Sequence, residues 1–476
     1  MNGFGVGRQM DDTMFHPNGR STLSSNDDRD RDSYSSSICE ITDCESRDSS
    51  NLYHTTTVLR VCRQQVLKPY WKLLFVIGWR PFGRDRINYH CGWKALNVIY
   101  PLLLVALMFY VYAYRILSCQ GKYDVPLIVP STDISPTIVP HGGSNVTTPM
   151  SFTIEPAAET YHICTHLISS YVFPDVLHFL AFLLGFWYFR IQDNEQMDAM
   201  IQQAFLHTTP IQHGTNTQST MIRAMKWILI CGALWVVGMM GVLALFLTAF
   251  GLESTIYPFF SVQAWNIVLL GVNVFGCLIY NSIIAAVVVN YTVQCETIIC
   301  FMRSIQEQLL EKTGDLRMIM HDILKVWQAT HQLNGPMANM MSLLVFNFAA
   351  MVVVGVSLLL FQNQTEINPL VLTYRVCFFL LWLVILVFPF VQAARLSSIY
   401  NKIEQAALEM RVFGYLTSTP RDLDSFLQFV TLAKYKVRLL FIPVDKSLVY
   451  GILLLTTFLL IVLVQTGIIV APSLYL

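Results

Sequence analysis

Hydrophobic residues in this chain collect into seven long blocks that polar segments separate. Each block is roughly 20 residues or longer, the length that a helix needs to cross a hydrocarbon core about 30 Å thick. The blocks cover residues 96–117, 169–190, 225–250, 262–289, 338–361, 371–394 and 447–471. Because backbone polar groups inside lipid must be satisfied within their own segment, each block is predicted to be a helix. The expected fold class is an all-α membrane protein with seven transmembrane helices.

Helical spacing of apolar residues continues between some of these blocks. Segment 296–333 is predicted to be a long helix that Gly314 can interrupt, with a break at Gly335-Pro336 before the fifth block. Segments 396–410 and 421–439 show the same spacing. The apolar faces of these helices must pack somewhere, either on one another within one chain or against other subunits in a cytoplasmic assembly domain.

The segment before the first block is apolar, aromatic and basic at once. Residues 66–83, VLKPYWKLLFVIGWRPFG, are too few and too charged to span a bilayer. They are typical of an interfacial helix, with Trp71 and Trp79 expected near the headgroups and lysines beside them.

Composition agrees with a membrane protein. Hydrophobic residues make up 54% of the 476 positions and charged residues 13%, about half the charge of a soluble domain. The net charge is zero, so nothing favours a nucleic-acid partner. Residues 1–58 differ, with ten serines, ten acidic residues and no apolar core, so we expect a disordered tail without a cleaved signal peptide.

Lysine and arginine predict the orientation. Twenty-three of them flank one side of the blocks, eight each in 59–94 and 395–446, whereas the opposite loops hold Lys122 and almost nothing else. The positive-inside rule then places the N-terminus in the cytoplasm and the C-terminus outside the cell, with the plasma membrane as the expected location. The predicted parts are a tail (1–58), an interfacial pre-helix (59–94), spans one to four (95–290) with a long extracellular loop (118–168), a cytoplasmic helical loop (291–337), spans five and six (338–394), a cytoplasmic helical anchor (395–446) and span seven (447–471).

The outer loops carry candidate modification sites. Sequons at Asn145 and Asn363 fall in predicted extracellular loops, so we expect a glycoprotein. The sequon at Asn290 lies at the inner end of span four and should remain unglycosylated. Cys119 and Cys164 bracket the long outer loop and are the cysteine pair placed in the oxidising compartment, so they are a disulfide candidate.

A short His-Cys-His pattern precedes span two. His162, Cys164 and His166 have a spacing that a metal ion can use, but loop histidines beside a disulfide are the favoured interpretation. We expect neither a metal nor a cofactor. The sequence also lacks phosphate-loop, G-x-S-x-G and H-E-x-x-H motifs, so nothing in it indicates an enzyme.

Span seven contains an amide in otherwise apolar surroundings. Gln465 is costly in lipid unless it faces protein or water. One interpretation is a hydrogen bond between helices. The other is a pore, in which Gln465 and Thr466 form a polar ring beside a hydrophobic constriction at Val462.

Several polar and aromatic residues in the outer halves of spans two to six are candidates for a ligand pocket. Asp175 and His178 lie three residues apart, on one helical face, and suggest a pocket or polar network. Arg375 beside Tyr374 can reach the interface or face a cavity. The remaining candidates, as aromatic and amide walls for a small organic ligand, are Phe246, Phe250, Trp265, Asn266 and Asn273.

The final stretch, LLFIPVDKSLVYGILLLTTFLLIVLVQ, resembles the insect gustatory and odorant receptor superfamily. In that family a Phe/Ile-Pro-hydrophobic-Asp element precedes span seven, and Ile442 to Asp445 fit it. Gln465 fits the glutamine of the family's T-Y-(five apolar)-Q-F motif, whereas the other motif positions do not match. The segment LKPYWKLLFVIGWRPF is similar to the family's start. The tail and the long outer loop depart from it and suggest a gustatory receptor-like member.

The resemblance implies a tetrameric ligand-gated cation channel, a homotetramer or a heterotetramer with related subunits. Span seven of each subunit would line the central pore, with Gln465 at the pore position. A small-molecule ligand would bind in the outer halves of spans two to six, and cations would permeate. Two other classes remain open. A G-protein-coupled receptor needs the opposite orientation, and a secondary transporter usually has an inverted repeat, which is not evident here.

Overall fold

The computed structural model is described here for residues 60–82, 91–120, 168–192, 200–202, 204, 214–250, 263–312, 315–360, 369–415, 418–432, 437–439, 442–452, 454 and 458. These residues belong to one compact unit within positions 50–476. Nearly all of them are helical.

Five long apolar segments of the described chain can cross a membrane by length and composition. Four of them lie in α3 (Cys91–Gln120), α7 (Gly214–Phe250), α9 (Gln263–Leu310) and α12 (Pro369–Phe413). The fifth, Leu316–Leu360, ends in α11 (Ala338–Leu360). The chain is therefore a multi-pass membrane protein. The blocks expected at 96–117, 225–250, 262–289, 338–361 and 371–394 are confirmed as helices.

The second and seventh blocks differ from the other five. The second is a helix in three pieces, with π-helical turns η2 (Ile168–Val172) and η3 (Trp187–Ile191) on either side of α5 (Phe173–Phe186). Helical residues of the seventh block are described only as far as Phe458, and most of that block lies outside the described residues.

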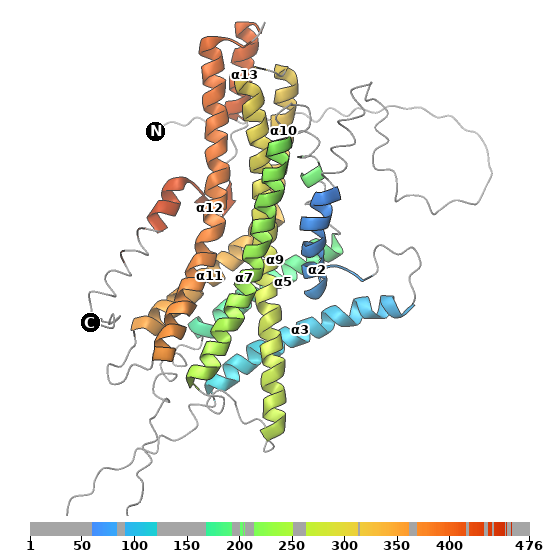
Figure 1. The fold of residues 1–476 in the computed structure, drawn as a ribbon, viewed down its shortest axis with the longest axis vertical. Helices are drawn as coiled ribbons and strands as arrows, with labels where there is room; N and C mark the ends of the chain where they lie inside the picture. The colour runs from blue at the N-terminus through green and yellow to red at the C-terminus, as the bar shows by residue number, and fades with distance from the viewer. Residues whose placement is uncertain are drawn as a thin grey trace, which may run out of the picture. The chain divides into compact units, whose positions relative to one another are not determined.

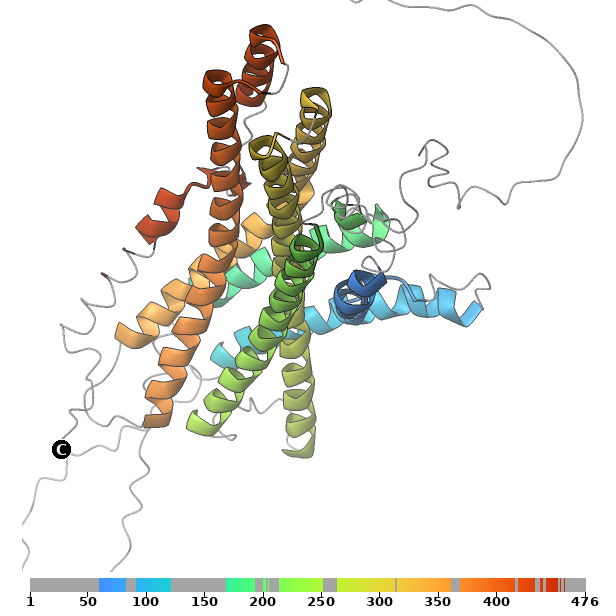
Figure 2. The ribbon, with the colours of Figure 1, turned by 45° about the horizontal axis from the view of Figure 1, so that its top comes forward.

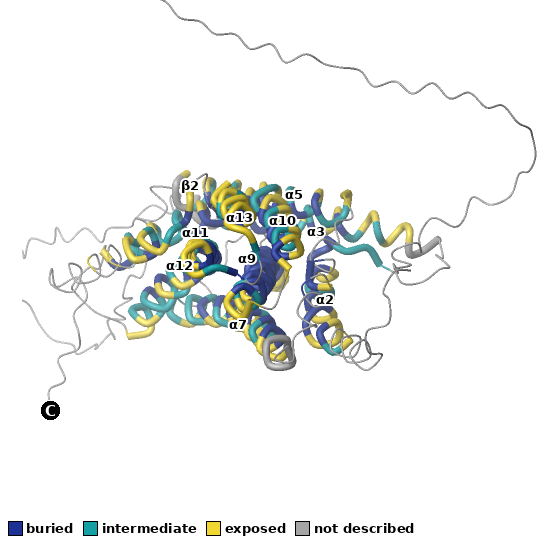
Figure 3. The backbone as a smooth tube through the Cα atoms, turned by 90° about the horizontal axis from the view of Figure 1, so that it is seen from above, coloured by how far each residue is buried: buried dark blue, intermediate teal, exposed yellow. Residues whose placement is uncertain are grey.

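Helix α9 occupies the centre of the arrangement. Figure 1 shows α7, α9 and α12 running along the long axis, and Figure 2 shows α3 crossing them obliquely. Viewed along the bundle, α9 is the buried element in the middle (Figure 3). Every residue from Ile279 to Met302 is buried, and a helix that is buried all round needs neighbours on every side. Helices α7, α12, α10 (Leu316–Gln332) and α3 supply them.

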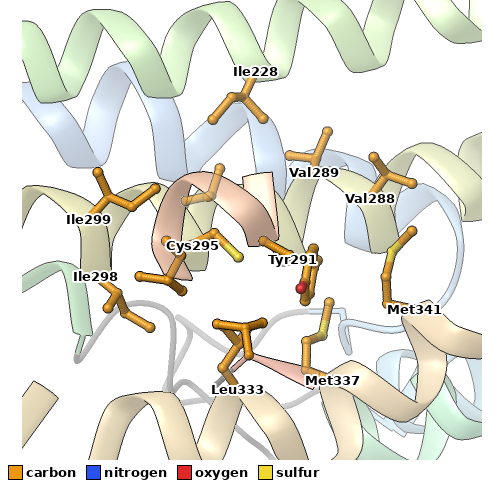
Figure 4. Packing of buried hydrophobic residues seen from close by; sticks show 14 of the residues in the cluster. Ile228, Val288, Val289, Tyr291, Cys295, Ile298, Ile299, Leu333, Met337 and Met341 are labelled. Carbon is orange, nitrogen blue, oxygen red and sulfur yellow. The ribbon is translucent and has the colours of Figure 1, made fainter. Parts of the chain in front are cut away.

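The core around α9 is made of aliphatic, sulfur-containing and aromatic side chains. Figure 4 shows Tyr291, Cys295 and Ile298 of α9 facing Leu333 and Met337. All five are less than 3% exposed. Methionine fills irregular gaps between helices well because its side chain is unbranched and flexible.

The helices between the spans agree largely with the expected pattern. Helix α9 ends at Leu310 and α10 begins at Leu316, so the break expected near Gly314 is confirmed. Asp315 caps α10 by accepting a hydrogen bond from the Arg317 amide. The break at Gly335-Pro336 is a kink inside η4 (Leu333–Met337), where Gly335 has a ψ of −130°. Helix α12 continues without interruption from its apolar block to Phe413.

The segment expected as a helix over 421–439 is shorter than predicted. Helix α13 spans Pro420–Leu432, and the following residues form β1 (Arg438–Leu439), which pairs antiparallel with β2 (Ile442–Pro443). The described chain is thus not purely helical. Pro443 is compatible with this short ladder because proline is tolerated on a sheet edge.

The segment expected as an interfacial helix is η1 (Arg63–Leu67) followed by α2 (Lys68–Val76). Its helical structure is confirmed, and Trp79, which was expected near the headgroups, is enclosed by protein. Trp79 is fully buried and its ring stacks on Phe189 at 5.2 Å and on Phe182 at 6.1 Å. The indole is therefore packed inside the protein, against rings of α5 and η3.

Candidate functional site

A polar cluster that is largely buried joins four helices, α3, α5, α9 and α11. It consists of Tyr112 and Arg115 of α3, Asp175 and His178 of α5, Tyr280 of α9 and Asn347 of α11. Arg115 Nη1 lies 3.1 Å from Asp175 Oδ1, and its guanidinium lies 4.7 Å over the Tyr280 ring. A charge inside a membrane protein is tolerated when it is paired, and this pair meets that condition.

His178 is held on both sides of its ring. Its Nε2 lies 3.2 Å from the backbone carbonyl of Tyr280, and its Nδ1 lies 2.8 Å from the Tyr112 hydroxyl. A carbonyl oxygen only accepts, so in the neutral ring Nε2 carries the proton and Nδ1 accepts from Tyr112. The imidazole also stacks on the Tyr280 ring at 3.7 Å. The expected face shared by Asp175 and His178 is therefore part of a polar network.

Asn347 completes the cluster by donating its amide to the Tyr280 hydroxyl at 3.2 Å. Not every polar atom is satisfied, because Asp175 Oδ2 and Asn347 Oδ1 are buried without a hydrogen-bond partner among the described residues. Buried polar networks specify one arrangement of helices, since an alternative packing would leave more such atoms unpaired. The polar cluster thus fixes how α3, α5, α9 and α11 meet.

A second group, the aromatic cluster, lies between α7 and α12 and consists of Phe246, Phe250, Tyr374 and Phe378. The ring centroids of Phe246 and Phe250 lie 5.3 Å and 6.0 Å from that of Tyr374, and Phe378 lies 6.0 Å from it on the other side. Three of the expected pocket residues, Phe246, Phe250 and Tyr374, are therefore brought together. These rings are only partly buried.

Tyr171 connects the two clusters. It lies on η2, within electrostatic range of Arg115 and Asp175 on one side and of Tyr374 on the other. The π-helical turn η2 thus lies near both the polar cluster and the aromatic cluster.

The remaining pocket candidates are placed elsewhere or differently. Trp265 is 60% exposed on the surface of α9, so it does not line a cavity within one chain. Asn266 and Asn273 are buried on the same helix. Arg375 is 4% exposed, so its side chain is enclosed by protein.

Sequence reasoning missed Arg115, Tyr112, Tyr280 and Asn347. Arg115 carried a usable signal, because an ionisable residue inside a predicted span calls for a partner, and Asp175 was the available acid. Nothing in the local sequence distinguished the two tyrosines or the asparagine, since their roles arise only from the packing of four helices.

Several predicted residues lie outside the described part of the chain. They are Gln465, Thr466 and Val462 of the expected pore, the sequons at Asn145 and Asn363, Cys164, and the side chain of Cys119. Asn290 is described and is fully buried, with its amide 3.3 Å from Met337 Sδ, so a glycan has no room there. Within the described ranges no group of three His, Cys, Asp or Glu residues is arranged to hold a metal.

A cavity is present among the helices that extend beyond the spans. It measures about 20 Å³ and is lined by side chains of α9, α10, α12 and α13, among them Met302, Ile323 and Tyr400. Beside it the hydroxyls of Thr330 and Tyr400 lie 2.7 Å apart. A space of this size accommodates about one water molecule and is too small for an organic ligand.

No protein-family model and no curated protein sequence matches the chain. Among solved structures, the chain is similar to the insect olfactory receptor OR5 from Machilis hrabei in complex with eugenol. The TM-score is 0.55 at 13% identity, over 86% of this chain and 99% of the receptor. A second structure of this receptor from Machilis hrabei gives a TM-score of 0.51 at 14% identity, over 87% of this chain and 98% of the receptor.

The chain has the fold of this insect olfactory receptor. The resemblance inferred from residues 442–445 and Gln465 is thus supported at the level of fold, with almost the whole receptor covered.

Proposed function

We propose that this protein is a chemoreceptor-like, ligand-gated cation channel of the plasma membrane. The observation that supports this most is the structural likeness to the olfactory receptor over 99% of that receptor's chain. In this proposal four subunits assemble, as a homotetramer or with related chains. Span seven of each lines a central pore, with Gln465 and Thr466 as a polar ring and Val462 as the constriction. The N-terminus is cytoplasmic.

The ligand in this proposal is a small, mostly apolar molecule with an aromatic ring. The similar receptor was solved with eugenol, which has this chemistry. Phe246, Phe250 and Tyr374 offer ring faces to such a ligand, and Tyr171 and Tyr374 offer hydroxyl groups. A largely apolar site with a few polar groups is the usual form of a small-molecule pocket. Binding favours the open state only as far as the ligand prefers that state.

The test is electrical. The full chain, expressed in cells without other chemoreceptors, should pass cation current when a panel of small aromatic compounds, eugenol included, is applied. Gln465→Leu should change the relative permeability of cations while assembly persists. Gln428→Leu is the matched control, because Gln428 is exposed on α13, away from any proposed pore.

Two results would count against the proposal. One is surface-expressed, tetrameric protein that passes no current with any compound of the panel. The other is an unchanged permeability ratio in Gln465→Leu with currents of ordinary size, which would remove Gln465 from the pore.

A further inference from the structure

A short hairpin holds the point where the chain enters span seven. Strands β1 and β2 precede the helix that begins at Lys446, and β1 contacts both α11 and α12. Val437, Leu439 and Val444 are each at most 1% exposed, so one side of the hairpin is part of the core. The element from Ile442 to Asp445, which resembles the family's element before span seven, thus includes part of a packed hairpin.

Both backbone groups of Val444 are hydrogen-bonded. Its amide donates to the Val437 carbonyl at 3.0 Å within the hairpin, and its carbonyl accepts from the Ser397 hydroxyl of α12 at 2.8 Å. A buried carbonyl that loses its donor costs about as much as a lost hydrogen bond. Ser397 is 7% exposed, so water does not readily replace its hydroxyl. The start of span seven is thereby joined to α12 across 47 residues of chain.

The other strand is joined to the kink before α11. The amide of Arg438 in β1 donates to the side-chain oxygen of Asn334 at 3.2 Å, although the two residues are 104 positions apart. Asn334 precedes Gly335, whose ψ of −130° marks the kink in η4, and α11 begins at Ala338. One hairpin therefore carries hydrogen bonds to α12 and to the start of α11.

The same two helices carry residues of both clusters described above. Tyr374 and Phe378 of the aromatic cluster lie on α12, and Asn347 of the polar cluster lies on α11. Ser397 is about 35 Å from Tyr374 along α12 at the usual rise per residue. Packed rigid elements and hydrogen bonds are what carries coupling between distant sites. A displacement of α12 at the aromatic cluster would therefore reach Val444 through one hydrogen bond, without passing along α13.

We propose that Ser397 and Asn334 are positioning residues that couple α12 and α11 to span seven through the hairpin. A ligand that shifts α12 toward its position in the open state moves the entry of span seven with it. The inference rests on the proposed channel function, and it assigns the route from the ligand to the pore helix. Each of the two hydrogen bonds is large enough to measure, because a typical one changes an equilibrium about fivefold.

The first measurement does not need current. Hydrogen exchange of the amides of residues 444–452 in the purified full chain reports how firmly the start of span seven is held. We expect Ser397→Ala and Asn334→Ala each to speed this exchange about fivefold. Ser397→Thr keeps the hydroxyl and Asn334→Asp keeps the acceptor oxygen, so both should leave it nearly unchanged. Ser398→Ala is the matched control, because Ser398 is the next residue of α12 and its hydroxyl makes no hydrogen bond to the described part of the hairpin.

The second measurement separates coupling from ligand binding. The probe is eugenol, or the compound of the aromatic panel that evokes the largest current. At a saturating concentration, Ser397→Ala and Asn334→Ala should each shift the equilibrium between closed and open channels about fivefold toward closed. The rise of the unfolding midpoint that the same compound causes in the purified chain should persist. A merely structural defect would lower both quantities, and Ser398→Ala should change neither.

Four results would count against the proposal. Unchanged exchange in both alanine variants would overturn it whatever the currents. Faster exchange with unchanged currents would remove the coupling and leave the channel function intact. Ligand-independent current in the alanine variants would contradict the direction of the effect, because the hairpin would then hold the channel shut. If the unmodified chain passes no current, the proposed function fails and the coupling fails with it, while the exchange result still decides whether the hairpin holds residues 444–452.

Discussion

Arg115 and Asp175 lie 60 residues apart in the sequence and form an ion pair with 3.1 Å between Nη1 and Oδ1. The pair links α3 to α5 within the polar cluster. Asp175 is nearly buried, whereas the Arg115 side chain is 24% exposed. The relative position of α3 and α5 therefore depends on this ion pair, because either charge without its partner would be energetically costly inside a span.

Loss of Asp175 should destabilise the protein. Asp175→Ala leaves the Arg115 charge without its partner, and after allowance for the exposure of Arg115 we expect a loss of about 2 kcal/mol. The measurement is the thermal unfolding midpoint of the purified chain in detergent. Asp424→Ala is the control, because Asp424 pairs with Arg411 at 2.8 Å with both side chains more than half exposed, and should cost under about 1 kcal/mol. Equal effects of the two substitutions would contradict the prediction.

Gly185 is expected to tolerate no side chain. A Cβ added there would lie 2.2 Å from the fully buried Trp79 ring, which cannot move without disturbing Phe182 and Phe189. Gly185→Ala should therefore strongly reduce the yield of folded protein, measured by fluorescence-detected size-exclusion chromatography. Gly241→Ala on α7 is the control, since nothing lies within 4 Å of its added Cβ, and alanine should stabilise the helix by up to about 1 kcal/mol. A normal profile for Gly185→Ala would mean that Trp79 is not packed as described.

The start of α13 should depend on pH. The Thr419 hydroxyl donates to Asp422 Oδ2 at 2.7 Å, which together with the Thr419 amide lowers the pKa of the Asp422 carboxyl below its ordinary value near 3.8. Because the folded pKa is the lower one, the carboxylate stabilises the helix start above about pH 4, and this is lost as the pH falls through the folded pKa. Amide hydrogen exchange of residues 419–425, expressed as protection factors, should show the loss. Asp422→Asn should remove the pH dependence, and an unchanged dependence in that variant would contradict this assignment.

The aromatic cluster should determine ligand sensitivity if the proposed channel activity holds. Tyr374→Ala removes a ring that lies within 6.0 Å of Phe246, Phe250 and Phe378, so it should raise the ligand concentration for half-maximal current about tenfold or more. Trp227→Ala is the control, because Trp227 is 60% exposed on the same helix that carries Phe246. An unchanged concentration dependence in Tyr374→Ala would place the ligand elsewhere.

The sequence predicted the helices well, because a long apolar block in a membrane must satisfy its own backbone hydrogen bonds and a helix does so. The start of α11 at Ala338 follows from Gly335-Pro336, and the continuation of α12 into a polar segment follows from its unbroken helical spacing. The hairpin at Arg438–Pro443 was not predicted, since two-residue strands leave no periodic signal.

The site was predictable only in part. Asp175 and His178 could be paired from their spacing on one helix, and the rings of Phe246, Phe250 and Tyr374 from their residue type. The buried position of Trp79 could not be inferred, because it depends on a glycine at position 185 of another helix. Tertiary packing, which the local sequence does not show, determines the burial of the Trp79 side chain.

Helix α9 has a mechanical consequence. Its 48 residues form one uninterrupted rod, about 70 Å long at the usual rise per residue. A tilt of about 5° at one end of such a rod displaces the other end by about 6 Å. Tyr280 of the polar cluster and the packing surface for α10 are both on this rod. A small rotation of α9 near Tyr280 would therefore displace the surface that packs on α10 sideways. No loop lies between these two parts of the helix to absorb the motion.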